Sequence, residues 1–128
     1  HQAEGHNAWN YGPLDEVKAN MAATGFPPDR TVFVQGKVEE TLAGRRPERI
    51  ALLRLDTDFY ESTRAELAAL APLLGPGGVL VVDDYGSWAG SKQAVDEWLA
   101  NTGLPLFLAR SDVGGRIAVM PGLARPGA

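Results

Sequence analysis

Two apolar segments that run straight into acidic residues constrain this chain of 128 residues more than any other feature. Residues 50–55 (IALLRL) and 79–82 (VLVV) are almost continuously apolar, which is typical of strands covered on both faces of a parallel sheet. The first runs into Asp56-Thr57-Asp58 and the second into Asp83-Asp84. Because the carboxyl ends of parallel strands meet at one edge of a sheet, we expect these acids to converge.

Helical and strand patterns alternate along the rest of the chain. We expect a helix that opens with Pro13 at its first position, a strand at 31–36, and short helices at 38–42 and 91–100. Thr63 and Glu66 have the spacing of a capping box, which predicts a helix start at Thr63. A turn at 75–78 and a hairpin of strands 104–109 and 116–120 complete the pattern. The fold class predicted is α/β: a parallel sheet in which the C-terminal part of the chain forms an antiparallel hairpin at one edge.

Length and composition favour one domain, here 13–121, with an arm at 1–12 and a tail at 122–128. The formal net charge of −4, without a basic stripe, argues against nucleic acid or an anionic membrane as a partner. The absence of cysteine excludes disulfides, thiolate nucleophiles and cysteine-ligated zinc. No apolar run reaches the ~20 residues of a membrane span and no signal sequence is visible, so a cytoplasmic protein is expected.

Converging carboxylates repel one another unless a cation or a proton lies between them. Several hard oxygen ligands, without cysteine or paired histidine, favour Mg²⁺ or Mn²⁺ over zinc. The competing interpretation is that Asp58, or the Asp83-Asp84 pair, simply caps the turn or helix that follows.

The acidic motifs and their surroundings resemble the macrocin O-methyltransferase family. The resemblance rests on 53–63 (LRLDTDFYEST) and 77–86 (GGVLVVDDYG), is extended by 14–17, 32–36 and 93–97, and covers roughly residues 9–120. It implies a Rossmann-like methyltransferase sheet and a metal-dependent enzyme that methylates a sugar hydroxyl of a natural product with S-adenosylmethionine. By this resemblance Asp56, Asp83 and Asp84 match the metal ligands, and Asp56 also matches the general base.

Further candidates flank the acids. Gln35 and Gly36 end the strand predicted at 31–36 and are candidates for contact with the adenine of S-adenosylmethionine, a plain turn being the alternative. Tyr60 and Tyr85 are candidates for orienting the small-molecule substrate. The aromatic and histidine residues of the arm form either a lid or an ordinary packing segment; they are His1, His6, Trp9 and Tyr11.

The resemblance also implies features that this sequence does not display. Enzymes of this class carry a glycine-rich turn after the first strand and an acid after the second, and neither is visible before residue 31. We therefore expect the chain to match the C-terminal part of the family fold, with the first strands missing. The strand edges left open predict self-association into a homo-oligomer, and binding of S-adenosylmethionine by this chain alone is expected to be weak.

Two alternatives remain open. The first is a truncated, non-catalytic methyltransferase-like module that binds a partner or a metal. The second is a phosphatase of the Asp-x-Asp type, which requires a downstream lysine and a large insertion before the second acidic pair. Here Lys92 follows the second pair, and 24 residues separate Asp58 from Asp83.

Overall fold

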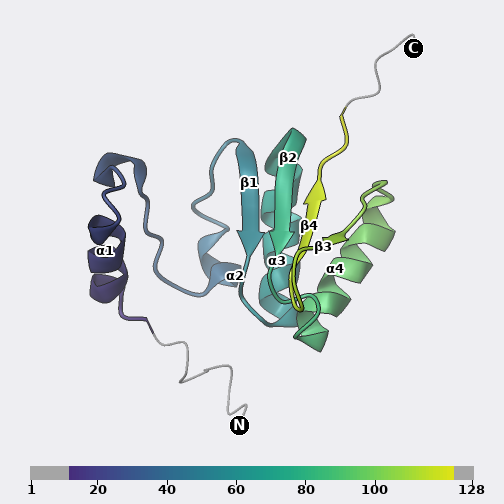
Figure 1. Cartoon of the computed structure of the whole chain (residues 1–128), viewed down its shortest axis with the longest axis horizontal. Helices are drawn as coiled ribbons and strands as arrows, with labels where there is room; N and C mark the ends of the chain where they lie inside the picture. Colours follow the sequence, from purple (N-terminus) through teal and green to yellow (C-terminus); the bar gives the residue numbers. More distant parts are fainter. Residues whose placement is uncertain (1–11, 123–128) are drawn as a thin grey trace. The chain divides into compact units, whose positions relative to one another are not determined.

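The computed structural model describes residues 12–122, which fall into two compact units divided between Gln35 and Gly36 (Figure 1). The predicted arm and tail lie outside the described residues except for Gly12 and Gly122, and so do His1, His6, Trp9 and Tyr11. Over residues 12–122, none of the helices combines the length and the apolar character needed to cross a bilayer.

The N-terminal unit contains helix α1 (Leu14–Ala23) and the 3-10 turn η2 (Pro28–Arg30). Pro13 is the N-cap of α1 rather than its first residue, and Gly25 follows the helix with a φ of 75°. The strand predicted at 31–36 is wrong: these residues are not in a strand. The β-branched and aromatic residues there favour extended backbone, but a strand also needs a neighbour with which to form ladder hydrogen bonds.

The C-terminal unit is built on a four-stranded mixed sheet with the order β1-β2-β4-β3. Its strands are β1 (Ile50–Leu55), β2 (Leu74–Val82), β3 (Ala109–Arg110) and β4 (Arg116–Val119). β1 and β2 are parallel, whereas β4 is antiparallel to both β2 and β3. The α/β class, the parallel central pair and the antiparallel C-terminal hairpin are therefore confirmed.

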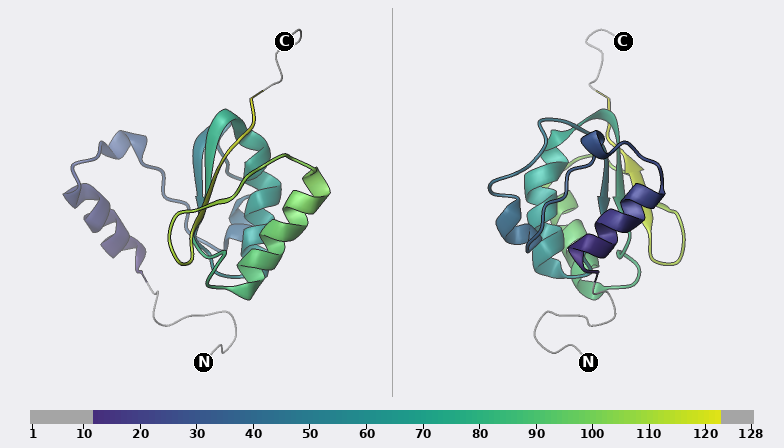
Figure 2. Two further views of the ribbon diagram at one scale, coloured as in Figure 1. Left: turned by 45° about the vertical axis from the view of Figure 1, so that its right-hand side comes forward. Right: turned by 90° about the vertical axis from the view of Figure 1, so that its left-hand side faces the viewer.

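One face of this sheet carries the core. Helices α3 (Tyr60–Leu70) and α4 (Ala89–Thr102) lie on that face (Figure 2), and the short α2 (Val38–Thr41) packs beside α3. The core cluster is apolar and comes from β1, β2, α3, the 3-10 turn η3 (Ala71–Leu73) and α4; it consists of Leu53, Leu55, Leu67, Ala71, Leu74, Leu80, Val82 and Val95. On the opposite face Leu52 and Val119 are 62% and 61% exposed.

Three predicted details differ from the structure. The hairpin forms, but its first strand has only two residues, because Pro105 lacks an amide hydrogen and residues 104–108 are irregular. The predicted turn at 75–78 lies inside β2, where the register with β1 shifts between Ile50 and Leu52. The capping box is wrong, because α3 begins at Tyr60 and Thr63 is buried within the helix.

Candidate functional site

The parallel pairing of β1 and β2 brings their acidic ends to one level. Leu53 pairs with Leu80 and Leu55 with Val82, and the Asp83 amide donates to the Leu55 carbonyl at 2.9 Å. Asp56 and Asp83 therefore leave the sheet side by side, and Asp84 follows one residue later.

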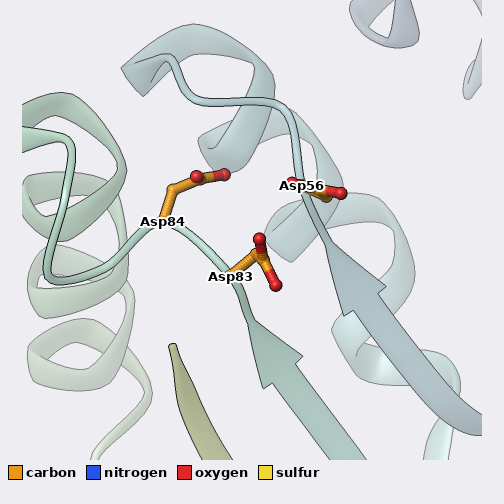
Figure 3. A group of neighbouring side chains, drawn as sticks. All are labelled: Asp56, Asp83 and Asp84. Atoms are coloured by element: carbon orange, nitrogen blue, oxygen red, sulfur yellow. The ribbon is translucent and has the colours of Figure 1, made fainter. Parts of the chain in front are cut away.

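The three carboxylates meet at this edge (Figure 3). One oxygen each from Asp56, Asp83 and Asp84 lies within 4.8 Å of the other two. Asp56 is exposed, Asp83 is half-buried and Asp84 is buried, so the cluster extends from the surface toward the interior. The sequence predicted this convergence from the strand ends alone.

Arg54 was not predicted as part of the site, yet it contacts two members of the cluster. Its Nη1 lies 2.8 Å from Asp56 Oδ2, and its Nη2 donates to Asp83 Oδ1 at 3.0 Å. The hydrogen bond to Asp83 is the main cause that raises the pKa of the guanidinium. The signal in the sequence was a lone charged residue within an apolar strand, two positions before an acid and therefore on the same side of the strand.

Asp84 is the buried member of the cluster. Burial, together with the nearby charge of Asp58, raises the pKa of its carboxyl to about 6. Its Oδ2 accepts the backbone N–H of Asp58 at 3.3 Å. A carboxylate held in this environment is stabilised when a proton or a cation neutralises it.

The loop between β1 and α3 is fixed by a hydrogen bond within the loop and by hydrogen bonds with α3. Asp58 has a φ of 64°, and the Phe59 amide donates to the Thr57 carbonyl at 2.7 Å, which closes a tight turn centred on Asp58. The Thr57 hydroxyl donates to Glu66 Oε2 at 2.9 Å. Ser62 Oγ donates to the Thr57 carbonyl at 3.2 Å, so α3 holds this loop at two points.

Glu66 is buried in α3, and burial raises the pKa of its carboxyl to about 7. Sequence reasoning assigned this residue to a capping box, whereas the structure directs its carboxyl to the loop that carries Asp56. The signal available in the sequence was a glutamate four residues before Leu70, on the side of the helix that carries apolar residues.

The structure places the two candidate tyrosines against α4. The Tyr60 hydroxyl donates to Glu97 Oε2 at 2.7 Å, and the Tyr85 hydroxyl donates to Asp96 Oδ1 at 2.6 Å. Lys92 also pairs with Asp96 and lies over the Tyr85 ring. Both hydroxyls are thus engaged by carboxylates outside the three-aspartate cluster, and a role with substrate stays a prediction.

Gln35 and Gly36 lie where the two units are divided, Gln35 ending the first and Gly36 opening the second. Gly36 has a φ of 140°, and a Cβ atom there would lie 2.7 Å from the Thr41 side chain. Only glycine fits this approach to α2 without a shift. Contact of either residue with a cofactor stays a prediction.

Comparison with known proteins identifies the family. The family model for macrocin-O-methyltransferase (TylF) matches residues 3–117. The chain belongs to the macrocin-O-methyltransferase family. This membership confirms the resemblance seen in the sequence and removes the phosphatase alternative.

The curated relatives of this chain carry the names of O-methyltransferases that act on natural products. The chain is 38% identical over 99 residues, 77% of its length and 38% of the relative's, to 8-demethyl-8-(2,3-dimethoxy-alpha-L-rhamnosyl)-tetracenomycin-C 4'-O-methyltransferase of Streptomyces olivaceus. It is 34% identical over 91 residues, 71% of its length and 35% of the relative's, to mycinamicin III 3''-O-methyltransferase of Micromonospora griseorubida. The chain thus spans between a third and two fifths of the length of these relatives.

Solved structures agree with this membership. The O-methyltransferase NovP superposes with a TM-score of 0.81 at 31% identity, over 84% of this chain and 45% of NovP. CalS11, a TDP-rhamnose 3'-O-methyltransferase of calicheamicin biosynthesis, superposes with a TM-score of 0.65 at 27% identity, over 84% of this chain and 53% of CalS11. The chain therefore has part of the Rossmann-like methyltransferase fold.

The donor set of the cluster fits a hard divalent cation. It offers three carboxylates, without sulfur or imidazole, at the spacing that one ion can bridge. Burial, with a smaller contribution from the charges of Asp58 and Asp56, raises the pKa of Asp84, and a bound cation would offset this penalty on the ionised carboxylate. Asp56, Asp83 and Asp84 are the residues of this macrocin-O-methyltransferase family chain that would hold such an ion.

Proposed function

We propose that this chain carries the cation-binding and proton-accepting part of an S-adenosylmethionine-dependent O-methyltransferase that acts on a hydroxyl of a natural product, most simply a sugar hydroxyl. The observation that carries the proposal is the three-aspartate cluster at the carboxyl edge of β1 and β2, in a chain of the macrocin-O-methyltransferase family. The named substrates of the relatives, which include rhamnose derivatives, support a sugar as the acceptor.

In methyl transfer from S-adenosylmethionine, the acceptor oxygen forms a bond to the methyl carbon while the bond between that carbon and the sulfonium sulfur breaks. The acceptor hydroxyl loses its proton, and S-adenosylhomocysteine leaves with the electron pair of the broken bond. A neutral sugar hydroxyl is a poor nucleophile, so the reaction requires a proton acceptor and a fixed direction of attack. A divalent cation, when bound, lowers the pKa of a hydroxyl that coordinates it.

The chain's own residues divide these tasks by position. Asp84 is buried and anchored to the loop through the Asp58 amide, which suits a structural ligand. Asp56 and Asp83 are accessible at the surface, with side chains 44% and 41% exposed. Exposure therefore allows either one to receive the hydroxyl proton, and the family resemblance assigns this role to Asp56.

Isothermal titration calorimetry with MgCl₂ or MnCl₂ tests the cation site on this chain. We expect a single site that is lost in the double variant Asp83→Asn, Asp84→Asn, because amides lack the negative charge that attracts the ion. The pair Asp15→Asn, Asp29→Asn removes the same charge in the N-terminal unit and should leave binding unchanged. Retention of the site in the Asp83/Asp84 variant would refute the assignment.

Turnover tests the role of Asp56. In a preparation that methylates deoxysugar-bearing acceptors with labelled S-adenosylmethionine, Asp56→Asn should lose at least about 100-fold in rate, which is typical for removal of a general base. Because asparagine retains one oxygen ligand, cation binding should fall much less than turnover. Near-normal methylation by this variant would exclude Asp56 as the proton acceptor.

Donor binding is a separate question. Within the described residues, β1 and β2 are followed by acidic loops rather than by a glycine-rich turn that could approach the methionine end of the donor. Equilibrium dialysis of this chain with labelled S-adenosylmethionine should therefore give weak binding or none. A micromolar dissociation constant would show that these residues contain a donor site that the proposal lacks.

A further inference from the structure

Arg54 occupies a place that the proposed function leaves unexplained. It lies in β1 between Leu53 and Leu55, both of which point into the core, so its own side chain leaves the opposite face of the sheet. Arg54 pairs with Val81 across the β1–β2 ladder, two positions before Asp83. The guanidinium therefore lies near the carboxyl ends of both strands and contacts the acid that follows each of them.

The two contacts use different nitrogens and different carboxylates. Nη1 binds Asp56 at 2.8 Å and Nη2 binds Asp83 at 3.0 Å, so the guanidinium bridges two of the three aspartates of the cluster. The third, Asp84, is held by the Asp58 amide instead. The guanidinium therefore places a positive charge beside the three negatively charged carboxylates.

We propose that Arg54 is an internal counter-cation of the Asp56–Asp83–Asp84 cluster: it holds Asp56 and Asp83 together in the cation-free protein, and a divalent cation binds in competition with it. The inference rests on the proposed cation site and concerns its regulation. Both the guanidinium and the cation neutralise the same carboxylates, and as two positive charges they repel each other. Arg54 therefore weakens cation binding, and it reduces the repulsion among the three carboxylates when no cation is bound.

The competing expectation is that Arg54 organises the ligands and so strengthens binding. The side chain of Arg54 is 52% exposed, and ion pairs in such positions contribute little free energy, so the energetic gain from organising the ligands is small. Repulsion between a divalent ion and a unit positive charge at a few ångströms is the larger effect even in a hydrated site. The sign of the change in affinity on removal of the charge distinguishes the two roles.

Calorimetric titration of the chain with MgCl₂ measures this sign. Arg54→Gln should bind Mg²⁺ about tenfold more tightly than the unsubstituted chain, and Arg54→Lys, which keeps the charge, should stay within about threefold of it. Arg45→Gln is the matched control: it removes an equal charge from an exposed loop residue and should leave the affinity unchanged. The tenfold difference should shrink in 1 M salt, because screening weakens the repulsion.

A second measurement needs no substitution. In the unsubstituted chain, the guanidinium ¹⁵N–¹H signals of Arg54 should show restricted rotation without added ion. They should show freer rotation as MgCl₂ is titrated in, because the ion weakens the bridge. Signals that stay restricted at saturating Mg²⁺ would contradict the competition.

The possible outcomes separate this inference from the proposed function. If Mg²⁺ binds and Arg54→Gln binds it equally or more weakly, the counter-cation role is wrong while the cation site stands. If Mg²⁺ binds only after Arg54 is replaced, the role is supported in its strongest form. If neither chain binds Mg²⁺, or if binding survives Asp83→Asn with Asp84→Asn, the cation site itself is wrong and the role falls with it.

Discussion

Asp58 adopts a backbone conformation that few side chains tolerate. Its φ of 64° is the only positive value at a non-glycine residue among residues 12–122. Aspartate and asparagine visit this left-handed region more readily than other residues, and β-branched side chains are strongly disfavoured there. The conformation aims the Asp58 amide at Asp84 and closes the turn that follows Asp56.

We expect Asp58→Val to unfold more easily than Asp58→Asn by about 1–2 kcal/mol, because valine must pay the strain of the left-handed backbone. Both variants remove the same charge, so their difference isolates the backbone effect. Urea unfolding of the two variants at pH 7 measures it. Equal midpoints would mean that the loop relaxes to another conformation at little cost.

Glu66 makes the stability of the protein depend on pH. In the unfolded chain its carboxyl titrates near the ordinary pKa of 4.5, whereas in the folded protein burial raises the pKa to about 7. Between these two values the folded protein keeps a proton that the unfolded chain has released. Its contribution to stability is therefore complete below about pH 4.5 and is lost as the pH rises to about 7.

Replacement of Glu66 by glutamine should remove this pH dependence while keeping an oxygen that accepts the Thr57 hydroxyl. Relative to the unsubstituted chain, Glu66→Gln should gain on the order of 2 kcal/mol in unfolding free energy between pH 4 and pH 8. Urea unfolding at several pH values measures the gain. Glu61→Gln, at an exposed position of the same helix, serves as the control, and an equal gain there would show that Glu66 is not responsible.

At the scale of elements, the approach of α4 to the start of α3 depends on one glycine. A Cβ atom at Gly90 would lie 2.9 Å from the Tyr60 nitrogen and 3.3 Å from the Tyr60 Cβ. Backbone at this distance cannot yield as a flexible side chain would. The contact sets the spacing between the two helices that cover the core.

Gly90→Ala should therefore destabilise the protein by about 1–3 kcal/mol, as overpacking of a close contact does. In an uncrowded helix the same substitution stabilises by roughly 0.5–1 kcal/mol, so the sign of the effect is diagnostic. Thermal unfolding followed by circular dichroism measures it. A higher midpoint for the alanine variant would mean that the helices separate without cost.

The sequence predicted best those elements for which the composition, the apolar pattern and the residues that follow all indicate the same structure. The apolar runs of β1 and β2 and the acids after them fixed both strands, their parallel pairing and the place of the site. The segment 31–36 has the composition of a strand but is not one, because strand formation depends on a neighbour that composition does not report. Thr63 and Glu66 have capping-box spacing, yet the helix starts earlier and uses both residues in its interior.

Within the site, spacing along the chain identified the acids but not the side chains that contact these acids or the loop that carries them. Arg54 and Glu66 each act across elements, Arg54 from β1 to the end of β2 and Glu66 from α3 to the loop after β1. Such contacts are set by the register of the sheet and the rotation of the helix, neither of which a local pattern determines. The engagement of the Tyr60 and Tyr85 hydroxyls with α4 escaped prediction for the same reason.

At the scale of the molecule, the three aspartates of the proposed cation site come together only when β1 and β2 are paired. A ligand that binds the folded protein and not the unfolded chain stabilises it by about 2.7 kcal/mol at 100 times its dissociation constant. We therefore expect the thermal midpoint to rise with added MgCl₂, to return on addition of EDTA, and to stay constant in the Asp83→Asn, Asp84→Asn variant. A rise of equal size in that variant would place the binding elsewhere.

The separation of the cluster in sequence also determines when it can form. The Arg54–Asp83 and Asp58–Asp84 contacts join residues 29 and 26 positions apart, with the whole of α3 in the intervening crossover. The loop must close and α3 must dock before these charges meet, so the repulsion among the aspartates arises late in folding. We therefore expect a cation bound at the proposed site to slow unfolding and to leave the rate of refolding nearly unchanged, because the contacts that it strengthens form late. The ion would in this way set the lifetime of the folded state more than the speed with which the state is reached.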